Sequence, residues 1–481
     1  MSATPYEVRW VPGNRWTRRL TLDDIVNLSP KFWDMHIDPI ICTDGTATTL
    51  LTIQYNLVAG TLGAFVSGRE DIRILVDDII NFRIIMGHGL DVSNMETPAT
   101  LLVDGRFELH TPHQEAAKFM PPTTPVLGRP CFAVVFAQLI VAGCPRGIRP
   151  FVVCLNDGFK MSPGISARGS SAPINHCLTT FHHVTLPSSA LLGQIDVSVP
   201  PRLHFLLSIW RVAVGTLALS SVAIPAYQYS IRRVVRGHDS GSALVLRVFH
   251  QEAIKLFADD QLSPFIRHGI ATAFKVVRDL LSSCSALSER CGAQGLFSFT
   301  NYCTSRIAIA EGDVVVLCIR LATELLPEKY SMPPSRNTHS LLALHENGLL
   351  QKYKSIIVDS GHRSAKFAAY GLPHCEDIVR VIGYQMAYDA VVAAQVPQSL
   401  IDLFRNLGWY VEHQLLSSEA LEDLEDSSIE RSLPHVAKWV ADLDVGSYVS
   451  APMVSDTAWA DFLSRLQKFE GKVTAKKIVV S

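Results

Sequence analysis

The stretch that decides the fold is "MGHGLDVSNMETPATLLVDGRFELHTP", residues 86–112. It holds two short apolar runs on either side of Asp104-Gly105, and an Asp-Gly pair in this position is typical of a β-hairpin turn. The next runs are also short, rich in β-branched and aromatic residues, and separated by Gly, Pro and Asn, as in "CFAVVFAQLIV", "IRPFVVCL" and "CLTTFHHVTLP". The sequence therefore predicts a β-domain over residues 86–200.

Helical patterns lie on both sides of this β-domain. Residues 1–85 contain an acidic first turn in "LTLDDIVNL", a long buried helix in "ATTLLTIQYNLVAGTLGAFV" and apolar residues at helical spacing in "GREDIRILVDDII". The later periodic segments run over 203–235, 243–290, 308–326, 338–370, 374–394, 397–415 and 418–443. "MPPSRNT", at 332–338, is expected to link two helical layers. The order of helix, sheet and helix predicts an α+β fold with segregated classes.

Composition excludes several classes of protein. The chain has 481 residues, of which 48% are hydrophobic and 18% are charged. This charged fraction is below the usual quarter or so, which suggests that another subunit covers part of the surface. A net charge of −2 gives no electrostatic reason to expect nucleic acid or an anionic membrane as a partner.

The cysteines and the chain ends indicate a cytoplasmic protein. None of the ten cysteines forms a Cys-x-x-Cys pair, which favours reduced thiols over disulfides or zinc. The first residues contain no apolar segment typical of a signal peptide, and the last, "KKIVVS", differ from a peroxisomal Ser-Lys-Leu ending. The longest apolar stretch, 212–229, contains Pro225 and is expected to be a buried helix rather than a membrane span.

The stretch at 86–112 resembles the acyl-CoA oxidase branch of the acyl-CoA dehydrogenase superfamily. In that branch Gly-His-Gly, Leu-Glu-Thr-Thr-Ala-Thr, a hairpin and His-Thr-Pro follow one another in the same order. Three later segments are similar to the family's Tyr-Ser-x-x-Arg-Arg, Cys-Gly-Gly-His-Gly and Phe-Glu-Gly-Glu: "YSIRRVV" at 229–235, "CGAQG" at 291–295 and "AEGD" at 310–313. The resemblance is collinear over roughly residues 38–470.

The resemblance implies an architecture and an activity. It implies a shortened helical N-terminal domain (1–85), a β-barrel-like, flavin-facing domain (86–200), a first helical bundle (201–331) and a second one (332–481). It also implies a homodimer with FAD between the β-domain and the first bundle. The implied reaction is the α,β-dehydrogenation of an acyl thioester, in which a glutamate removes the α-proton and the flavin takes the hydride.

Glu311, in "IAEGDVVVLCIR" (309–320), aligns with the catalytic base of that family. The alternative role for Glu311 is a carboxylate that stabilises the N-terminus of the following helix. An apolar pocket around the carboxyl would raise its pKa toward the range that a base needs. The histidines show no metal-ligand spacing, so no metal is expected.

The flavin side departs from the family pattern. Ile84 stands where the oxidases have a threonine that hydrogen-bonds the flavin, shortly before Gly87 of the Gly-His-Gly motif. Pro122 stands at the position of a glycine whose backbone approaches the flavin, and proline has no N–H to donate. Each lost hydrogen bond would weaken FAD binding by about 0.5–1.5 kcal/mol.

The pyrophosphate side is closer to the family pattern. Arg233 aligns with an arginine that binds the cofactor's pyrophosphate across the dimer, and its alternative role is a solvated charge at a helix end. Gly292 and Gly295 would let the backbone approach the same pyrophosphate, or they are ordinary turn glycines.

These residues lead to one principal hypothesis and two alternatives. The principal hypothesis is an FAD-dependent, oxidase-like enzyme that acts on an acyl thioester or a related activated substrate in specialised metabolism. A second is a cofactor-free enzyme that uses Glu311 for a cyclisation, isomerisation or elimination, motivated by Ile84, Pro122 and Val314-Val315. A third is a non-catalytic partner of an active paralogue, motivated by the low-charge composition.

Overall fold

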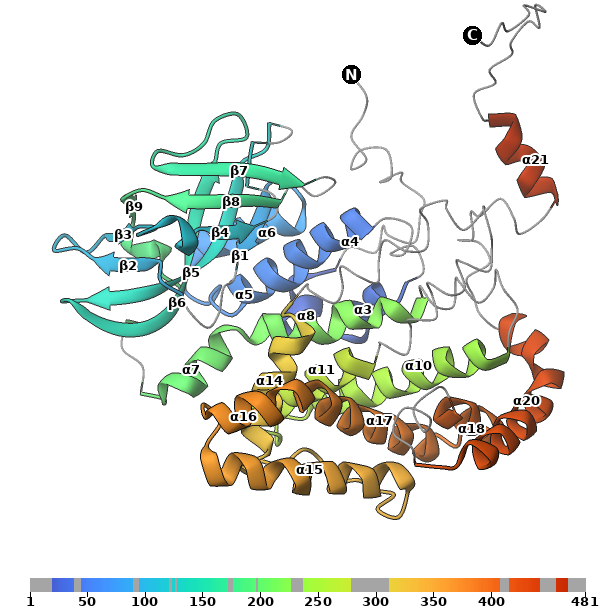
Figure 1. The fold of residues 1–481 in the computed structure, drawn as a ribbon. Helices are drawn as coiled ribbons and strands as arrows, with labels where there is room; N and C mark the ends of the chain where they lie inside the picture. The colour runs from blue at the N-terminus through green and yellow to red at the C-terminus, as the bar shows by residue number, and fades with distance from the viewer. Residues whose placement is uncertain are drawn as a thin grey trace, which may run out of the picture.

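The structure is a computed structural model, and it describes residues 20–38, 45–89, 95–120, 123–125, 128–171, 176–195, 198–225, 237–277, 311–406, 415–441 and 456–465. Within these ranges the chain forms helices first, then strands, then helices again (Figure 1). The predicted α+β class with segregated elements is therefore confirmed.

The N-terminal helices are α2 (Leu22–Val26), α3 (Pro30–His36), α4 (Gly45–Thr52), η3 (Ile53–Ala59), α5 (Gly60–Gly63) and α6 (Glu70–Ile80). Thr21 and Asp24 begin α2 with a capping box, in which each side chain accepts a hydrogen bond from the other residue's backbone N–H, at 3.1 and 2.9 Å. The long helix expected from "ATTLLTIQYNLVAGTLGAFV" is α4, η3 and α5 in succession. Its middle part, η3, is a π-helix whose residues are all buried.

The β-domain contains two sheets. The strands are β1 (Ile85–Gly89), β2 (Pro98–Leu101), β3 (Phe107–Leu109), β4 (Lys118–Met120), β5 (Cys131–Val141), β6 (Cys144–Asn156), β7 (Ile165–Ser171), β8 (His176–Phe181) and β9 (Val184–Leu186). One sheet has the order β1-β5-β2-β3-β9, with β6 paired to β5, and the other has the order β4-β8-β7. The hairpin predicted at Asp104-Gly105 joins β2 and β3, and Gly105 takes a φ of +82° there. The described strands do not close into a barrel.

Strand β5 is covered on both faces, which explains why its sequence is apolar at every position but Gln138. Ala133 and Val135 point into the core of the β-domain, whereas Val134 and Phe136 belong to the core formed by the helices. Successive side chains of a strand point to opposite faces, so one strand joins the two cores. The sheet is thereby fixed against the helices that carry the site.

The later helices are α7 (Pro201–Ser208), α8 (Trp210–Ser221), α10 (Gly237–Ala258), α11 (Pro264–Val277), α14 (Val314–Leu325), α15 (Leu341–Ser360), α16 (Ala365–Tyr370), α17 (Cys375–Ala393), α18 (Gln398–Asn406), α20 (Ser418–Ala441) and α21 (Asp456–Arg465). Within the periodic segment 243–290, α10 ends at Ala258 and a separate helix, α11, begins at Pro264. Proline is well suited to a first helical turn. The predicted linker does lie between α14 and α15. Asp389 of α17 holds it, accepting from Arg336 N at 2.8 Å and Asn337 Nδ2 at 2.6 Å.

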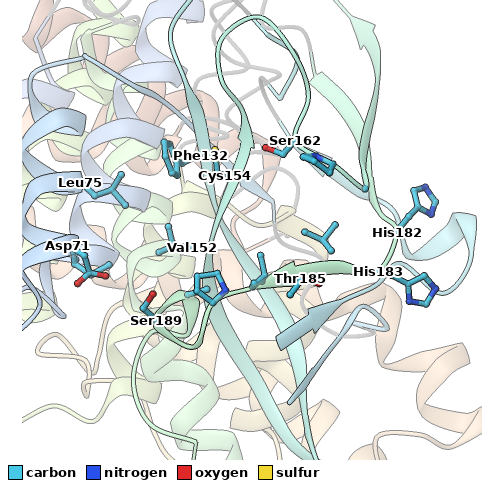
Figure 2. Close-up of a pocket in the computed structure, with 17 residues that line it drawn as sticks. Asp71, Leu75, Phe132, Val152, Cys154, Ser162, His182, His183, Thr185 and Ser189 are labelled. Atoms are coloured by element: carbon cyan, nitrogen blue, oxygen red, sulfur yellow. The ribbon is translucent and has the colours of Figure 1, made fainter. Parts of the chain in front are cut away.

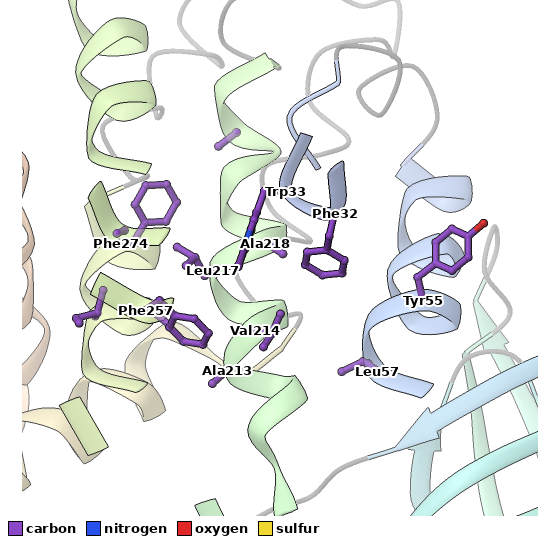
Figure 3. Packing of buried hydrophobic residues seen from close by; sticks show 14 of the residues in the cluster. Phe32, Trp33, Tyr55, Leu57, Ala213, Val214, Leu217, Ala218, Phe257 and Phe274 are labelled. Atoms are coloured by element: carbon purple, nitrogen blue, oxygen red, sulfur yellow. The ribbon is translucent and has the colours of Figure 1, made fainter. Parts of the chain in front are cut away.

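Helix α8 lies at the centre of the largest hydrophobic core. Figure 3 shows Val214 and Leu217 of α8 between Phe32 of α3 on one side and Phe257 and Phe274 of α10 and α11 on the other. No single helix in the described ranges has the length and apolar character needed to span a membrane. One pair, Arg202–Ser208 with Trp210–Pro225, meets those criteria only when joined across a bend of 52°.

Candidate acid–base site at Glu311

Glu311 precedes α14 in an unusual backbone conformation. Its φ is +58° and that of Gly312 is +98°, so two successive residues lie on the left-handed side of conformational space. For a residue with a Cβ, that conformation costs roughly 1–2 kcal/mol. Strain of this kind persists only where the surrounding structure holds the residue in place, and it is frequent at functional sites.

The helix cap that Glu311 could have provided is supplied by another residue. Asp313 is the N-cap of α14, and its carboxylate accepts hydrogen bonds from Val315 N at 3.0 Å and Val316 N at 3.2 Å. Glu311 lies two residues before this cap. The carboxylate of Asp313 therefore does what a capping acid does, and the capping role does not account for Glu311.

Two helices hold the turn through its backbone carbonyls. Thr216 of α8 donates a hydrogen bond from Oγ1 to the carbonyl oxygen of Glu311 at 2.8 Å. Lys275 of α11 donates one from Nζ to the carbonyl oxygen of Gly312 at 2.6 Å. These two bonds anchor both left-handed residues and offset the strain of Glu311.

The side chain of Glu311 packs directly on the backbone of α8. A Cβ added to Gly215 would lie 2.9 Å from both Cγ and Cδ of Glu311, and 2.8 Å from Nδ2 of Asn56. Real side chains do not approach so closely. Glycine at position 215 thus leaves the space that the side chain of Glu311 and the amide of Asn56 occupy against α8.

Burial makes Glu311 a weak acid. The residue as a whole keeps some exposed surface, but protein surrounds its carboxyl, and this burial raises the pKa of Glu311 to about 8. The positive charge of Lys275 acts in the opposite direction and lowers that pKa. A carboxyl with a pKa near the working pH can both release and accept a proton during a reaction.

The π-helix η3 brings two buried amides to this region. Asn56 donates from Nδ2 to the carbonyl oxygen of Arg211 at 2.9 Å, and its Oδ1 has no hydrogen-bond partner among the described residues. Gln54 donates from Nε2 to the carbonyl oxygens of Ile79 at 3.0 Å and Ile84 at 2.8 Å. Because π-helical turns are frequent at functional sites, η3 draws attention to the region between Glu311 and the start of β1.

Comparison with solved structures identifies this arrangement of helices and sheets. Acyl-CoA oxidase 1 of Yarrowia lipolytica matches with a TM-score of 0.72 and 14% identity, over 95% of this chain and 89% of that chain. Acyl-CoA oxidase 1 of Arabidopsis thaliana matches with a TM-score of 0.68 and 15% identity, over 92% and 90%. The chain has the acyl-CoA oxidase fold. Acyl-CoA oxidase-1 of Caenorhabditis elegans, in complex with FAD and ATP, matches with a TM-score of 0.64 and 15% identity, over 93% and 86%.

Comparison of sequences alone does not find this similarity to the oxidases. No family model matches the chain, and no curated protein matches it. The likeness to the oxidases therefore rests on the path of the backbone over nearly the whole chain, and at identities of 14–15% it establishes the fold and not the activity.

The flavin-side residues of this oxidase fold are described only in part. Ile84 is 7% exposed and belongs to the helical core, and its carbonyl oxygen accepts the bond from Gln54. Gly87 lies in β1, which pairs with β5 alone among the described strands. The other predicted cofactor residues lie outside the described residues: Pro122, Arg233, Gly292 and Gly295.

These positions allow a test of whether FAD fits the chain. The side chain at Ile84 has no hydrogen-bonding group and is packed in the core, so it does not fit a flavin contact. The outer edge of β1 offers backbone groups instead, and the absence of a Cβ at Gly87 permits close approach. The described residues thus offer backbone groups at the edge of β1 and no hydrogen-bonding side chain at position 84.

Two cavities in the described ranges lie away from Glu311. One, of about 650 Å³, lies between α6 and the sheet face formed by β5 and β6. Figure 2 shows Asp71 and Leu75 of α6 on one side of it and His182 and His183 on the opposite side. The other, of about 590 Å³, lies between the linker and α15, where burial raises the pKa of Glu346 to about 7.

Three residues of the Glu311 site were missed in the sequence, although a signal was present for two of them. Asn56 lies among the apolar residues of a helix, where a polar side chain needs a reason. Lys275 is the one charged residue of the apolar run "IATAFKVV", 270–277. Gly215 carried no such signal, because its role depends on what packs against it.

Proposed function

We propose that this chain is an oxidase-type enzyme that removes a proton from the α-carbon of an acyl thioester or a similarly activated substrate, with Glu311 as the base. The observation that carries the proposal is the Glu311 carboxyl itself, which is buried, has its pKa raised to about 8 and is held by two helices on a left-handed turn. The fold shared with acyl-CoA oxidases supports the choice of substrate class.

The chain's own residues have separate tasks in this proposal. Glu311 accepts the α-proton on a carboxylate oxygen and returns it to water after the product leaves. Thr216 and Lys275 fix the backbone on which the carboxyl stands, and Gly215 lets it lie against α8. A base fixed before the substrate arrives loses little freedom during the reaction, which lowers the barrier.

We propose FAD as the cofactor, held in part by the main chain of β1 near Gly87. When bound, FAD supplies the acceptor for the hydride from the β-carbon. The complex of the Caenorhabditis elegans oxidase with FAD supports this choice. We also propose a homodimer, which the low charge of the chain supports, and specialised metabolism, which the apolar residue at position 84 supports. The cytoplasm is the compartment that we propose.

A second candidate function is favoured by the same isoleucine. Ile84 is buried and apolar where a flavin contact would lie, and Glu311, mostly protonated at neutral pH, can donate a proton as well as accept one. Such a site could catalyse an isomerisation, a cyclisation or an elimination without a redox cofactor. A non-catalytic partner of an active paralogue is the third candidate.

Two measurements separate these candidates. The first is the amount of FAD that copurifies with the protein or binds on reconstitution, from its visible spectrum after acid release. The second is the exchange of α-hydrogens of butanoyl-CoA and decanoyl-CoA for deuterium in heavy water, with Glu311→Gln as the test and Glu422→Gln, an exposed glutamate of α20, as the control.

The combined results assign the function. Bound FAD together with exchange that Glu311→Gln abolishes and Glu422→Gln preserves supports the oxidase-type enzyme. Exchange that depends on Glu311 without FAD supports the cofactor-free enzyme. The absence of both FAD and exchange contradicts the two enzymatic candidates and leaves the partner role.

A further inference from the structure

Lys275 is a buried cation in an apolar helix. It lies in the last turn of α11, it is 1% exposed, and its neighbours Phe274 and Val276 are buried as well. Removing an ammonium group from water costs several kcal/mol unless nearby groups compensate. A lysine at this depth therefore needs a function that an apolar residue of the same size could not provide.

The ammonium group of Lys275 is directed at the Glu311 turn. Its Nζ lies 2.6 Å from the carbonyl oxygen of Gly312, the residue next to Glu311. Its charge also acts on the Glu311 carboxyl, where it opposes the effect of burial on the pKa. Lys275 thus binds the turn through a hydrogen bond, and its charge acts on the Glu311 carboxyl.

Among the residues that the structure describes, the other charged groups near the Glu311 turn make their hydrogen bonds elsewhere, and Nη1 of Arg211 has no partner there. Arg211 of α8 passes over Gly60 and donates from Nη2 to the carbonyl oxygen of Ile25 at 2.7 Å. Asp313, on the same loop as Glu311, is bound to the first backbone N–H groups of α14. The π-helix η3 has the sequence IQYNLVA and brings no charged side chain.

We propose that Lys275 is a positioning residue for Glu311: it fixes the left-handed turn through Gly312 and supplies the positive charge against which the Glu311 carboxylate forms. The catalytic meaning of this assignment rests on the proposed function of Glu311. The pairing itself does not, because it concerns the ionisation of Glu311 in the protein without substrate. A buried base needs such a charge, since burial alone would keep its carboxyl protonated.

The test is to measure the ionisation of Glu311 directly. The full-length protein is labelled with carbon-13 at the glutamate Cδ, and the Glu311 signal is assigned by its loss in Glu311→Gln. The midpoint of its titration is then followed by NMR in the wild type and the variants. This readout requires neither substrate nor FAD, so it can succeed or fail independently of the proposed function.

Four variants separate charge from structure. Lys275→Met removes the charge and the hydrogen bond, and we expect the midpoint to rise by about one pH unit or more. Lys275→Gln keeps a donor for Gly312 and loses the charge, so it should give a similar rise even if Lys275→Met folds poorly. Lys275→Arg keeps the charge and should restore a midpoint near that of the wild type. Thr216→Val removes the bond to the Glu311 carbonyl without changing any charge and should leave the midpoint where it is.

Two results would overturn the proposal. An unchanged or lower midpoint in Lys275→Gln would show that the lysine charge does not act on Glu311. A rise of the same size in Thr216→Val would show that the midpoint follows the geometry of the turn and not the charge. If the protein exchanges α-hydrogens, the pH profile of that exchange should move upward in Lys275→Gln by the same amount as the midpoint.

Discussion

Replacing Glu311 by glutamine should make the protein more stable, and increasingly so as the pH rises. The pKa of Glu311 is about 8 in the folded chain, against 4.5 for an unperturbed glutamate. The folded protein therefore holds this proton more tightly than the unfolded chain, and the stability that depends on it falls as pH rises from 4.5 to about 8. Glutamine stays neutral throughout and escapes this loss.

The magnitude follows from the size of the pKa difference. One bound proton corresponds to about 1.4 kcal/mol per pH unit. Between about pH 5.5 and about pH 7.5 the free energy of unfolding of the variant should therefore rise by about 2–3 kcal/mol relative to that of the wild type. Above the folded pKa of about 8 the difference should level off.

The assay is urea denaturation of both proteins at a series of pH values, with Glu422→Gln as the exposed control. Other titrating groups cancel in the difference between wild type and variant, so the pH dependence of that difference reports Glu311. A difference that stays constant within about 0.5 kcal/mol across this pH range would refute the assignment of a buried, weakly acidic carboxyl.

Three further predictions test the packing around the site. Gly215→Ala should lower the free energy of unfolding by about 1–3 kcal/mol, because its Cβ would collide with Glu311 and Asn56. The control Gly348→Ala, with nothing within 4 Å of its Cβ, should raise the free energy of unfolding by up to about 1 kcal/mol. Equal effects of the two substitutions in urea denaturation would contradict the close packing at Gly215. Gln54→Leu should lower the free energy of unfolding by about 1–3 kcal/mol in the same assay, since the carbonyls of Ile79 and Ile84 lose their donor. Gln261→Leu, at an exposed site, should change the free energy of unfolding little. Similar losses of stability in the two variants would argue against the role of Gln54. Asp389→Ala should speed tryptic cleavage after Arg336 because the linker loses its anchor, and an unchanged cleavage rate relative to Asp377→Ala would contradict this.

Local signals in the sequence predicted the local parts of the fold. The Asp104-Gly105 pair specified the β2–β3 hairpin because its turn geometry depends on two adjacent residues. The linker at 332–338 was recognisable from its prolines and polar residues. The π-helix could not be predicted in this way, because its extra width depends on the packing of Gln54 and Asn56 against other segments.

The sequence predicted the position of Glu311 but not the residues that surround it. The position of Glu311 came from resemblance, since an acid followed by glycine is a weak signal on its own. Its weak acidity arises from the burial of its carboxyl, and the hydrogen bonds that hold its turn come from Thr216 and Lys275, which are distant in the chain. Such a constellation has no short sequence pattern, because its members are brought together only by folding.

The π-helix η3 makes the length of its segment more important than its composition. An α-helix advances by about 100° per residue, so deletion of Tyr55, which lies between the two amides of η3, would rotate one amide away from its partner while the other stayed in place. Gln54 would then lose the start of β1, or Asn56 would lose α8. Apolar exchanges at the other positions of this segment should be tolerated far better than a change in the spacing of the two amides, so a homologue that keeps Gln54, Asn56 and their spacing would keep these contacts.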